Sequence, residues 1–237
     1  MFSSRKVSVL GGSKFKDEFS LSFDGTNDYV DTNADGTLAD ATYVFWCKST
    51  ETGQNKGVFG HGGLQKGAFH FNYNASRPLI YLNSTHSQYF SDNSAQDDGQ
   101  WHMWAVVIDA DDHSGHQVYV DGVLLSKSTG NGSGSITAYG DLIIGAESTS
   151  GNAFIGSMSE FCWYNKILTE SEIQTLYNGR EAYNHLEGVC SANLKGWWRM
   201  GDGTENNSGT TIYDMSSESN DATMTNMAAD DFTGDTP

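Results

Sequence analysis

The amino-acid sequence predicts an all-β protein built as a two-sheet antiparallel sandwich with one short surface helix. Of its 237 residues, 37% are hydrophobic and 12% aromatic, which is enough to form a core. Only 18% are charged beside 27 glycines, a balance that disfavours a helical bundle. The two prolines leave the turns to Ser, Thr, Asn, Asp and Gly, as short β connections require. A single sandwich domain commonly reaches about 200–250 residues, so we expect one large domain.

Short apolar runs separated by turn residues predict the strands. The runs 42–47 and 100–109 are apolar on both faces, as in the middle of a sandwich. Asp121 and Gly122 between two apolar runs predict a hairpin, and Gly156 predicts a bulge or bend. The expected strands are residues 19–23, 42–47, 68–74, 100–109, 116–120, 123–125, 141–145 and 153–164.

One helix is predicted after the last of these strands. Thr169 and Glu172 have the spacing of a capping box, and Leu168 and Ile173 that of a hydrophobic staple. Gly179 is placed to end the helix. Nothing on this segment is chemically reactive, so we expect it to be structural.

Six motifs in serial order resemble one known family. They are FDGTNDYV at 23–30, WH at 101–102, VYVDG at 118–122, LIIG at 142–145, FIGSM at 154–158 and YNKILTESEI at 164–173. Together they resemble the laminin-G-like, concanavalin A-like lectin/glucanase superfamily. The resemblance covers about residues 19–179 and implies a concanavalin A-like jelly-roll sandwich of two antiparallel sheets.

The two ends of the chain define the expected domain organisation. Residues 1–18 carry four of the 13 basic residues and are expected to form an N-terminal arm, followed by the sandwich over residues 19–179. Within the C-terminal segment 180–237, residues 196–203 and 213–224 resemble the strands with which the family usually begins. The segment either closes the same sandwich, as in a circularly permuted domain, or completes a neighbouring subunit. Because the termini of such sandwiches lie close together, closure of the same sandwich is the expectation.

Charge and hydropathy exclude several classes of partner. The 13 Lys and Arg residues against 30 Asp and Glu residues give a net charge of −17, which argues against nucleic-acid binding. No apolar run approaches the roughly 18 residues of a membrane span, and the first residues lack the apolar core of a signal peptide. The three cysteines are widely spaced and show no metal-ligand pattern, so we expect buried, reduced thiols.

Enzymatic activity is not expected. Glucanase relatives place paired carboxylates on one strand, whereas Glu160 stands alone in an apolar strand. The sequence also lacks a nucleophile elbow and a phosphate-binding glycine loop.

A structural Ca²⁺ ion is a plausible cofactor, because acidic loops supply the oxygen ligands that this ion prefers. The resemblance implies a calcium site near the turns that hold Asp24 and Asp28 and the loop that holds Asp214 and Asp221. The alternative is that these residues only shape their turns.

Carbohydrate binding would require exposed aromatic side chains beside amides and carboxylates. Tyr73, Tyr81 and Tyr89 are the candidate ligand-binding residues, with core or hairpin packing as the alternative.

The first functional hypothesis is a non-catalytic, lectin-like adhesion or decoration module on a virion surface. The motifs resemble the stand-alone laminin-G-like proteins of marine bacteriophages, which suggests a capsid decoration, tail or fibre protein. Its partners would be a virion scaffold or other structural subunits held through the N-terminal arm, cell-surface or polysaccharide glycans, and a second copy of the chain. The alternatives are a purely structural assembly or spacer protein and, more distantly, a polysaccharide-active enzyme. The alternative location is extracellular or on a cell surface, reached without a recognisable signal peptide.

Overall fold

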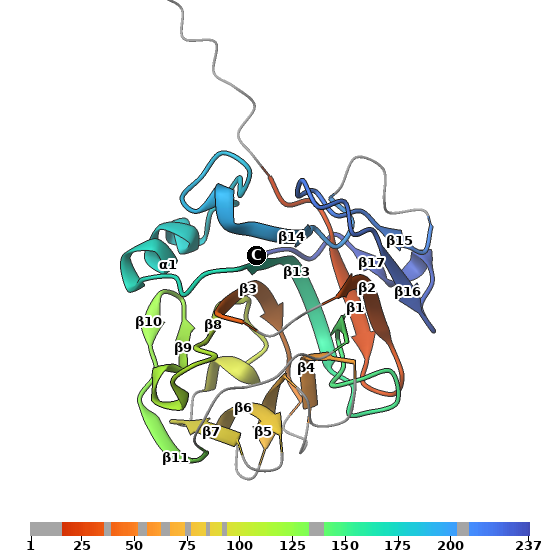
Figure 1. The fold of residues 1–237 in the computed structure, drawn as a ribbon. Helices are drawn as coiled ribbons and strands as arrows, with labels where there is room; N and C mark the ends of the chain where they lie inside the picture. Colours follow the sequence, from red (N-terminus) through yellow and green to blue (C-terminus); the bar gives the residue numbers. More distant parts are fainter. Residues whose placement is uncertain are drawn as a thin grey trace, which may run out of the picture.

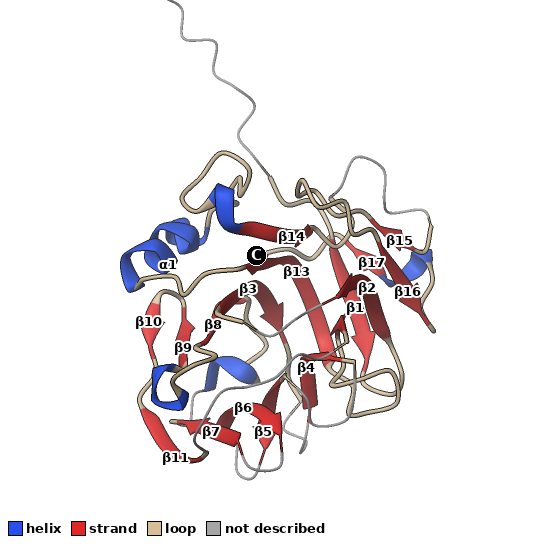
Figure 2. Cartoon of the chain, viewed as in Figure 1, coloured by secondary structure: helices blue, strands red, loops and turns tan. Residues whose placement is uncertain are grey.

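A computed structural model describes residues 16–35, 39–51, 56–62, 67–73, 77–83, 86–91, 94–132, 140–202 and 209–237. Strands dominate these residues, and helix α1 lies at the edge of the molecule (Figure 2). Most of the expected N-terminal arm, residues 1–15, lies outside the described residues. No helix in the described part of the chain is both long enough and apolar enough to cross a membrane.

The strands form two antiparallel sheets, which confirms the predicted sandwich (Figure 1). Within the described residues the first sheet has eight strands in the order β10-β9-β8-β3-β13-β1-β17, with β14 also paired to β13. Its strands are β1 (Ser20–Asp24), β3 (Ala41–Lys48), β8 (His102–Ile108), β9 (Gln117–Val120), β10 (Val123–Leu124), β13 (Ile155–Tyr164), β14 (Leu194–Trp198) and β17 (Phe232–Thr233).

The second sheet has nine strands over the same described ranges, in the order β11-β7-β6-β5-β4-β12-β2-β16-β15. Its strands are β2 (Tyr29–Asp35), β4 (Lys56–His61), β5 (Ala68–Tyr73), β6 (Arg77–Asn83), β7 (His86–Phe90), β11 (Lys127–Asn131), β12 (Asp141–Ile144), β15 (Thr211–Ile212) and β16 (Ala222–Thr225).

Alternating side chains of both sheets build the main core. Phe45 of the first sheet packs at 6.1 Å from Phe59 of the second and stacks at 5.3 Å on Phe161 of β13. Trp198 and Phe69 are also fully buried in this cluster. The apolar positions that the sequence shows on both faces of 42–47 are explained by a second cluster on the outer side of the first sheet.

Helix α1 (Glu170–Tyr177) covers this outer cluster and confirms the single predicted α-helix. Thr169 and Glu172 form the expected capping box, while Ile173 and Leu176 are buried. The helix ends one residue earlier than expected, since Asn178 takes the left-handed C-cap conformation with φ 49°. Short 3₁₀ turns complete the described helices: η1 (Ser94–Gln96), η2 (His113–Gly115), η3 (Asn178–Arg180), η4 (Ser191–Asn193) and η5 (Ala229–Asp231).

The C-terminal segment contributes strands to both sheets. Strand β14 pairs with β13, with Trp198 opposite Phe161, and β17 pairs with β1. Strand β16 pairs with β2, with Met224 opposite Val30. The two ends of the described chain meet, because the Thr236 hydroxyl donates to the Asp17 carbonyl at 3.3 Å.

None of the three cysteines forms a disulfide. Cys47 and Cys162 are buried as expected, and burial raises the pKa of both thiols. Cys190 is only half-buried, which corrects the expectation for that residue, because it lies in a loop rather than in a strand.

Candidate functional site

A cleft of about 360 Å³ lies between segments of both sheets. Strand β2 supplies one wall, strands β13 and β14 supply another, and the connection between β15 and β16 supplies the rest. Its volume falls within the roughly 300–1,000 Å³ typical of small-molecule sites. The lining residues are Asn33, Ala34, Asp35, Trp163, Lys195, Glu218 and Asn220.

The half-buried indole of Trp163 is the aromatic surface of this cleft. It stacks on Tyr43 with ring centroids 6.2 Å apart and an interplanar angle of 14°. His61 contacts the same indole edge to face at 6.2 Å. Both supporting residues are buried, so the orientation of Trp163 is set by the core behind it.

A hydrogen-bonded chain fixes the two residues that support Trp163. His61 Nδ1 donates to the Gly140 carbonyl at 3.3 Å, which leaves Nε2 to accept the Tyr43 hydroxyl at 2.8 Å. Burial lowers the pKa of His61 to about 4, so this ring is neutral at neutral pH. The support therefore brings no charge to the cleft.

Polar groups surround the indole. Lys195 Nζ lies 2.5 Å from Glu218 Oε1, and both side chains are about one third exposed, at 34% and 39%. Asn33 has φ 51° and donates from Nδ2 to the Asp221 carbonyl at 3.1 Å. Asp35 lies exposed at the end of β2. The cleft thus combines an aromatic face with amides, carboxylates and one ammonium group.

Asp214 organises the loop that carries Glu218 and Asn220. Its Oδ1 accepts the backbone N–H groups of Trp197 at 2.9 Å and Ser216 at 2.8 Å. Its Oδ2 accepts the Ser216 hydroxyl at 2.9 Å and the Asn220 N–H at 3.0 Å. A carboxylate offers about four acceptor positions, and all four are used here. A calcium ion would have to displace these donors, so the Asp214 carboxylate does not fit a calcium ligand.

The other proposed calcium ligands also act within their turns. Asp28 Oδ2 accepts the Asp24 N–H at 2.9 Å, and Asp24 Oδ1 accepts the Thr26 N–H at 2.7 Å. Burial raises the pKa of Asp28. Asp221 Oδ1 accepts the Asp214 N–H at 3.1 Å. The structure therefore shows two hydrogen-bonded pairs, Asp24 with Asp28 and Asp214 with Asp221.

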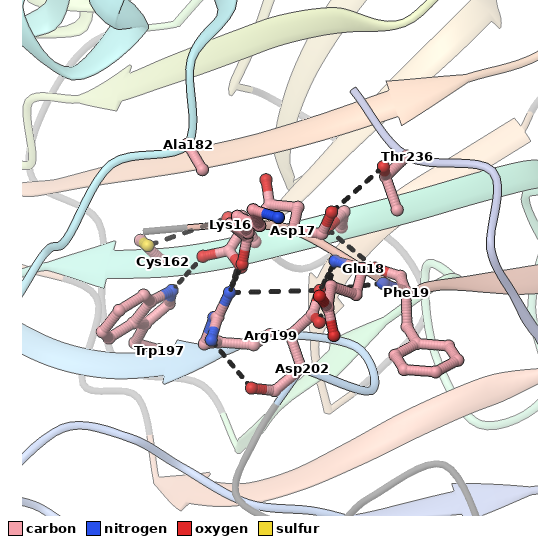
Figure 3. A network of polar contacts seen from close by, with 12 residues as sticks. Lys16, Asp17, Glu18, Phe19, Cys162, Ala182, Trp197, Arg199, Asp202 and Thr236 are labelled. Carbon is pink, nitrogen blue, oxygen red and sulfur yellow. Dashed lines mark hydrogen bonds and ion pairs between the residues drawn. The ribbon is translucent and has the colours of Figure 1, made fainter. Parts of the chain in front are cut away.

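A different group of acids gathers around Arg199 (Figure 3). Among the described residues, Asp17, Glu160 and Asp202 are the one group of three or more metal-ligating side chains whose ligand atoms all lie within 4.8 Å of one another. Arg199 Nε donates to Glu160 Oε1 at 2.7 Å, and its Nη2 donates to Asp17 Oδ1 at 3.1 Å. Trp197 Nε1 donates to Glu160 Oε2 at 2.5 Å. The guanidinium already supplies the positive charge that a cation would bring.

This acid–arginine cluster joins the start of the described chain and the turn after β14 to β13. Glu160 is 3% exposed, and burial raises its pKa well above the usual range, with the charge of Asp17 adding to the effect. It lies at a bulge in the pairing of β13 with β3, and its φ of 52° aims the side chain at Arg199. The Asp202 carboxylate accepts the Glu18 and Phe19 N–H groups at 2.9 and 3.0 Å. Since Glu160 is enclosed and both its oxygens are hydrogen-bonded, the cluster acts as a structural clamp.

The tyrosines suggested by the sequence lie away from the cleft. Tyr81 in β6 and Tyr89 in β7 are half-buried, and the Arg77 guanidinium stands 5.2 Å from the centre of the Tyr89 ring. Tyr73 ends β5, but its side chain lies outside the described residues. A smaller hollow of about 100 Å³ beside Tyr29 has little room for a sugar ring.

Sequence reasoning missed Trp163, Lys195 and Glu218 as a site. Trp163 appears in the sequence as one more apolar residue of a strand, and the other two lie far from it in the chain. The pattern of residues 153–164 contains no signal that one of its aromatic side chains faces a cleft.

Comparisons with known proteins agree with this fold. The model of the concanavalin A-like lectin/glucanases superfamily matches residues 24–174, more than half of the chain. A "putative carbohydrate binding protein" from Bacteroides ovatus superposes with a TM-score of 0.65 at 15% identity. That match covers 92% of this chain, which spans 60% of the Bacteroides protein.

A heptameric SAP-like pentraxin from Limulus polyphemus superposes with a TM-score of 0.56 at 17% identity, covering 73% of this chain and 84% of the pentraxin. No curated protein matches the chain in sequence. At these identities the solved structures demonstrate the shared fold, and the family model demonstrates membership. The chain belongs to the concanavalin A-like lectin/glucanases superfamily.

Proposed function

We propose that this protein is a non-catalytic, lectin-like module that binds glycans in the Trp163 cleft. The observation that carries the proposal is the half-buried indole of Trp163, held by Tyr43 and His61 beside an ion pair and two asparagines. A sugar ring has an apolar C–H face that packs on an aromatic ring and a rim of hydroxyls that bind amides and carboxylates. The cleft offers both kinds of contact, with room for about one or two sugar units.

The chemistry of the acids supports binding rather than hydrolysis. A general acid for glycoside cleavage needs a raised pKa, usually obtained by burial, beside a second carboxylate. Asp35 and Glu218 of the cleft are exposed, and Glu218 is paired with Lys195 at 2.5 Å. Glu160 is buried, but Arg199 and Trp197 hold its oxygens away from the cleft.

The biological setting that we propose is the surface of a virion, as a decoration, tail or fibre protein attached through residues 1–18. Support comes from the motif resemblance to phage proteins and from the net charge of −17, which favours a soluble surface. A purely structural spacer is the alternative, since the fold alone does not require a ligand.

Glycan binding by the full chain and by two aromatic variants tests the proposal. We expect Trp163→Ala to weaken binding by about 5- to 150-fold, by analogy with the 1–3 kcal/mol measured for bases stacked on aromatic side chains. Tyr89→Ala, which removes an aromatic ring outside the cleft, should keep the wild-type affinity. Thermal unfolding of each variant verifies that the fold is retained.

Two results would overturn the proposal. The first is wild-type silence on a broad array of neutral and acidic glycans, which would favour the structural spacer. The second is binding that survives Trp163→Ala and is lost in Tyr89→Ala, which would move the site to the β6–β7 surface.

A further inference from the structure

Carboxylate groups outnumber ammonium groups among the described residues that line the cleft. Of the described residues that line the cleft, Asp35 and Glu218 contribute two carboxylates and Lys195 contributes one ammonium group. Lys195 Nζ is already 2.5 Å from Glu218 Oε1. An acidic sugar entering the cleft would therefore meet the Asp35 carboxylate, which forms no ion pair within the described residues, and a lysine that is already engaged.

Neutral sugars meet a different environment. A carboxylate oxygen accepts hydrogen bonds from sugar hydroxyls, and an asparagine amide both donates and accepts. Asp35, Glu218 and Asn33 can thus bind a ring of uncharged hydroxyls without losing the Lys195–Glu218 pair. A uronate, sulfate or sialate would bring a second negative charge close to the carboxylates. Protein interfaces use such repulsion between like charges to reject wrong partners.

We propose that the cleft selects neutral glycans and that Glu218 is a specificity-determining residue, because it engages the lysine that an acidic sugar would need. This inference rests on the proposed function of the same cleft. Glu218 reaches Lys195 from the β15–β16 connection, 23 residues further along the chain, so the C-terminal segment supplies both members of the pair.

The electrostatic field of the whole protein also disfavours acidic glycans, but its effect can be separated from that of the cleft by adding salt. A net charge of −17 repels any anionic glycan at long range, and salt screens that repulsion beyond about 8–10 Å at physiological ionic strength. The contact between Lys195 and Glu218 is much shorter than this distance and keeps part of its effect. Selectivity that persists in moderate salt therefore reports on the cleft itself.

The test compares sugars that differ only at C6. Binding of gluco-, galacto- and manno-oligosaccharides is measured beside the matching uronate oligomers by calorimetry, for the wild type and Glu218→Gln. We expect the wild type to bind its neutral ligand at least about 10-fold more tightly than the uronate, a difference of about 1.4 kcal/mol. Glu218→Gln should reduce this ratio at least about threefold by gaining affinity for the uronate, because Lys195 becomes available.

Glu187→Gln is the matched control. It makes the same change in net charge at an exposed residue that does not line the cleft, so the ratio should stay at the wild-type value. Loss of an exposed ion pair is worth only about 0–1 kcal/mol, so Glu218→Gln should fold normally, and its unfolding temperature verifies this.

The outcomes separate the two proposals. Equal wild-type affinity for neutral and uronate oligomers overturns the selectivity, and an unchanged ratio in Glu218→Gln overturns the role of Glu218, while Trp163-dependent binding would still support the site. Binding of no glycan, or binding that does not depend on Trp163, overturns the proposed function itself. A ratio that changes equally in Glu187→Gln assigns selectivity to the general field and overturns the role of Glu218.

Discussion

Loss of Arg199 should destabilise the fold strongly, because this nearly buried side chain joins three parts of the chain. Its guanidinium donates from Nε to Glu160 at 2.7 Å and from Nη1 to the Asp202 carbonyl at 2.7 Å. Its Nη2 donates to the Lys16 carbonyl at 2.7 Å and to Asp17 Oδ1 at 3.1 Å. One side chain thus connects the beginning of the described chain, strand β13 and the turn after β14.

The magnitude follows from what Arg199→Met leaves behind. Methionine keeps the apolar stem, but Glu160 remains 3% exposed, beside the Trp197 indole N–H and the Asp17 carboxyl group. Breaking a buried ion pair by removing one partner costs about 3–5 kcal/mol, because the remaining carboxyl group must either stay charged without compensation or take up a proton. A domain has a free energy of unfolding of about 5–15 kcal/mol, so the variant should unfold at a much lower urea concentration.

The decisive comparison adds Glu160→Gln to Arg199→Met. Glutamine keeps an acceptor for the Trp197 N–H but carries no charge, so the double variant should recover at least about 1 kcal/mol relative to Arg199→Met alone. Urea unfolding of the full chain, followed by tryptophan fluorescence, gives the free energies. Arg77→Met is the control, since this arginine contacts the Tyr89 ring at the surface and its loss should cost about 1 kcal/mol or less. The reasoning is refuted if Arg199→Met costs no more than Arg77→Met, or if Glu160→Gln makes it worse.

Three further predictions concern other described contacts. Burial lowers the pKa of His185 to about 3. Between about pH 6.5 and pH 3 the unfolded chain therefore binds a proton at this residue and the folded chain does not, so the free energy of unfolding should fall as the pH falls through this range. In His185→Asn the amide carbonyl can accept the hydrogen bond from the Tyr164 hydroxyl. This variant should reduce the slope of unfolding free energy against pH in that range by up to about 1.4 kcal/mol per pH unit. Urea titrations at several pH values measure the slope, and an unchanged slope would contradict the prediction. Thr169→Ala should cost about 1 kcal/mol through loss of the cap on the Glu172 N–H, and Ser at the same position should restore it in the same unfolding assay. Calcium and chelator should leave the unfolding temperature equal if Asp214 keeps its four donors, whereas a calcium-dependent rise that Asp214→Asn abolishes would show that the ion displaces them.

The fold class was predictable because periodicity and turn chemistry are local. Residues 42–47 and 100–109 are apolar on both faces, and the structure places them in the neighbouring strands β3 and β8, between two apolar clusters. The Asp121-Gly122 turn and the capping box at Thr169 also depend on a few adjacent residues. Such signals do not depend on contacts with distant parts of the chain.

Other strands give no such local signal. All five residues of β11 are exposed, and the strand exists because it pairs with β7 at the edge of its sheet. Strand β2 alternates buried residues with polar ones, and its turn-like Asn and Asp residues hide the pattern. Pairing with β12 and β16 decides its conformation, and β16 lies almost 200 residues away in the chain.

The candidate site was harder to predict for the same reason. Glu160 is isolated from other acids in the sequence, but a bulge with φ 52° turns it towards Arg199 and Asp17, which are 182 residues apart in the chain. No periodicity encodes that conformation, because a non-glycine residue adopts positive φ only when its surroundings enforce it. Asp214 was proposed as a calcium ligand, with a turn-shaping role as the alternative, and in the structure its carboxylate accepts four hydrogen bonds from its own chain.

The clamp and the cleft share strand β14. Arg199 follows the strand directly, and Lys195 lies within it, with its neighbour Gly196 opposite Trp163 of β13. Arg199 holds the far end of β14 against Glu160, while the near end presents Lys195 to Glu218 beside the indole. Replacing a buried ion pair by apolar residues is often neutral for stability, so stability alone does not explain the Arg199–Glu160 pair. The pair lies at the end of the same short strand that supplies the ammonium group of the cleft, so a change at Arg199 would act on the strand that carries Lys195.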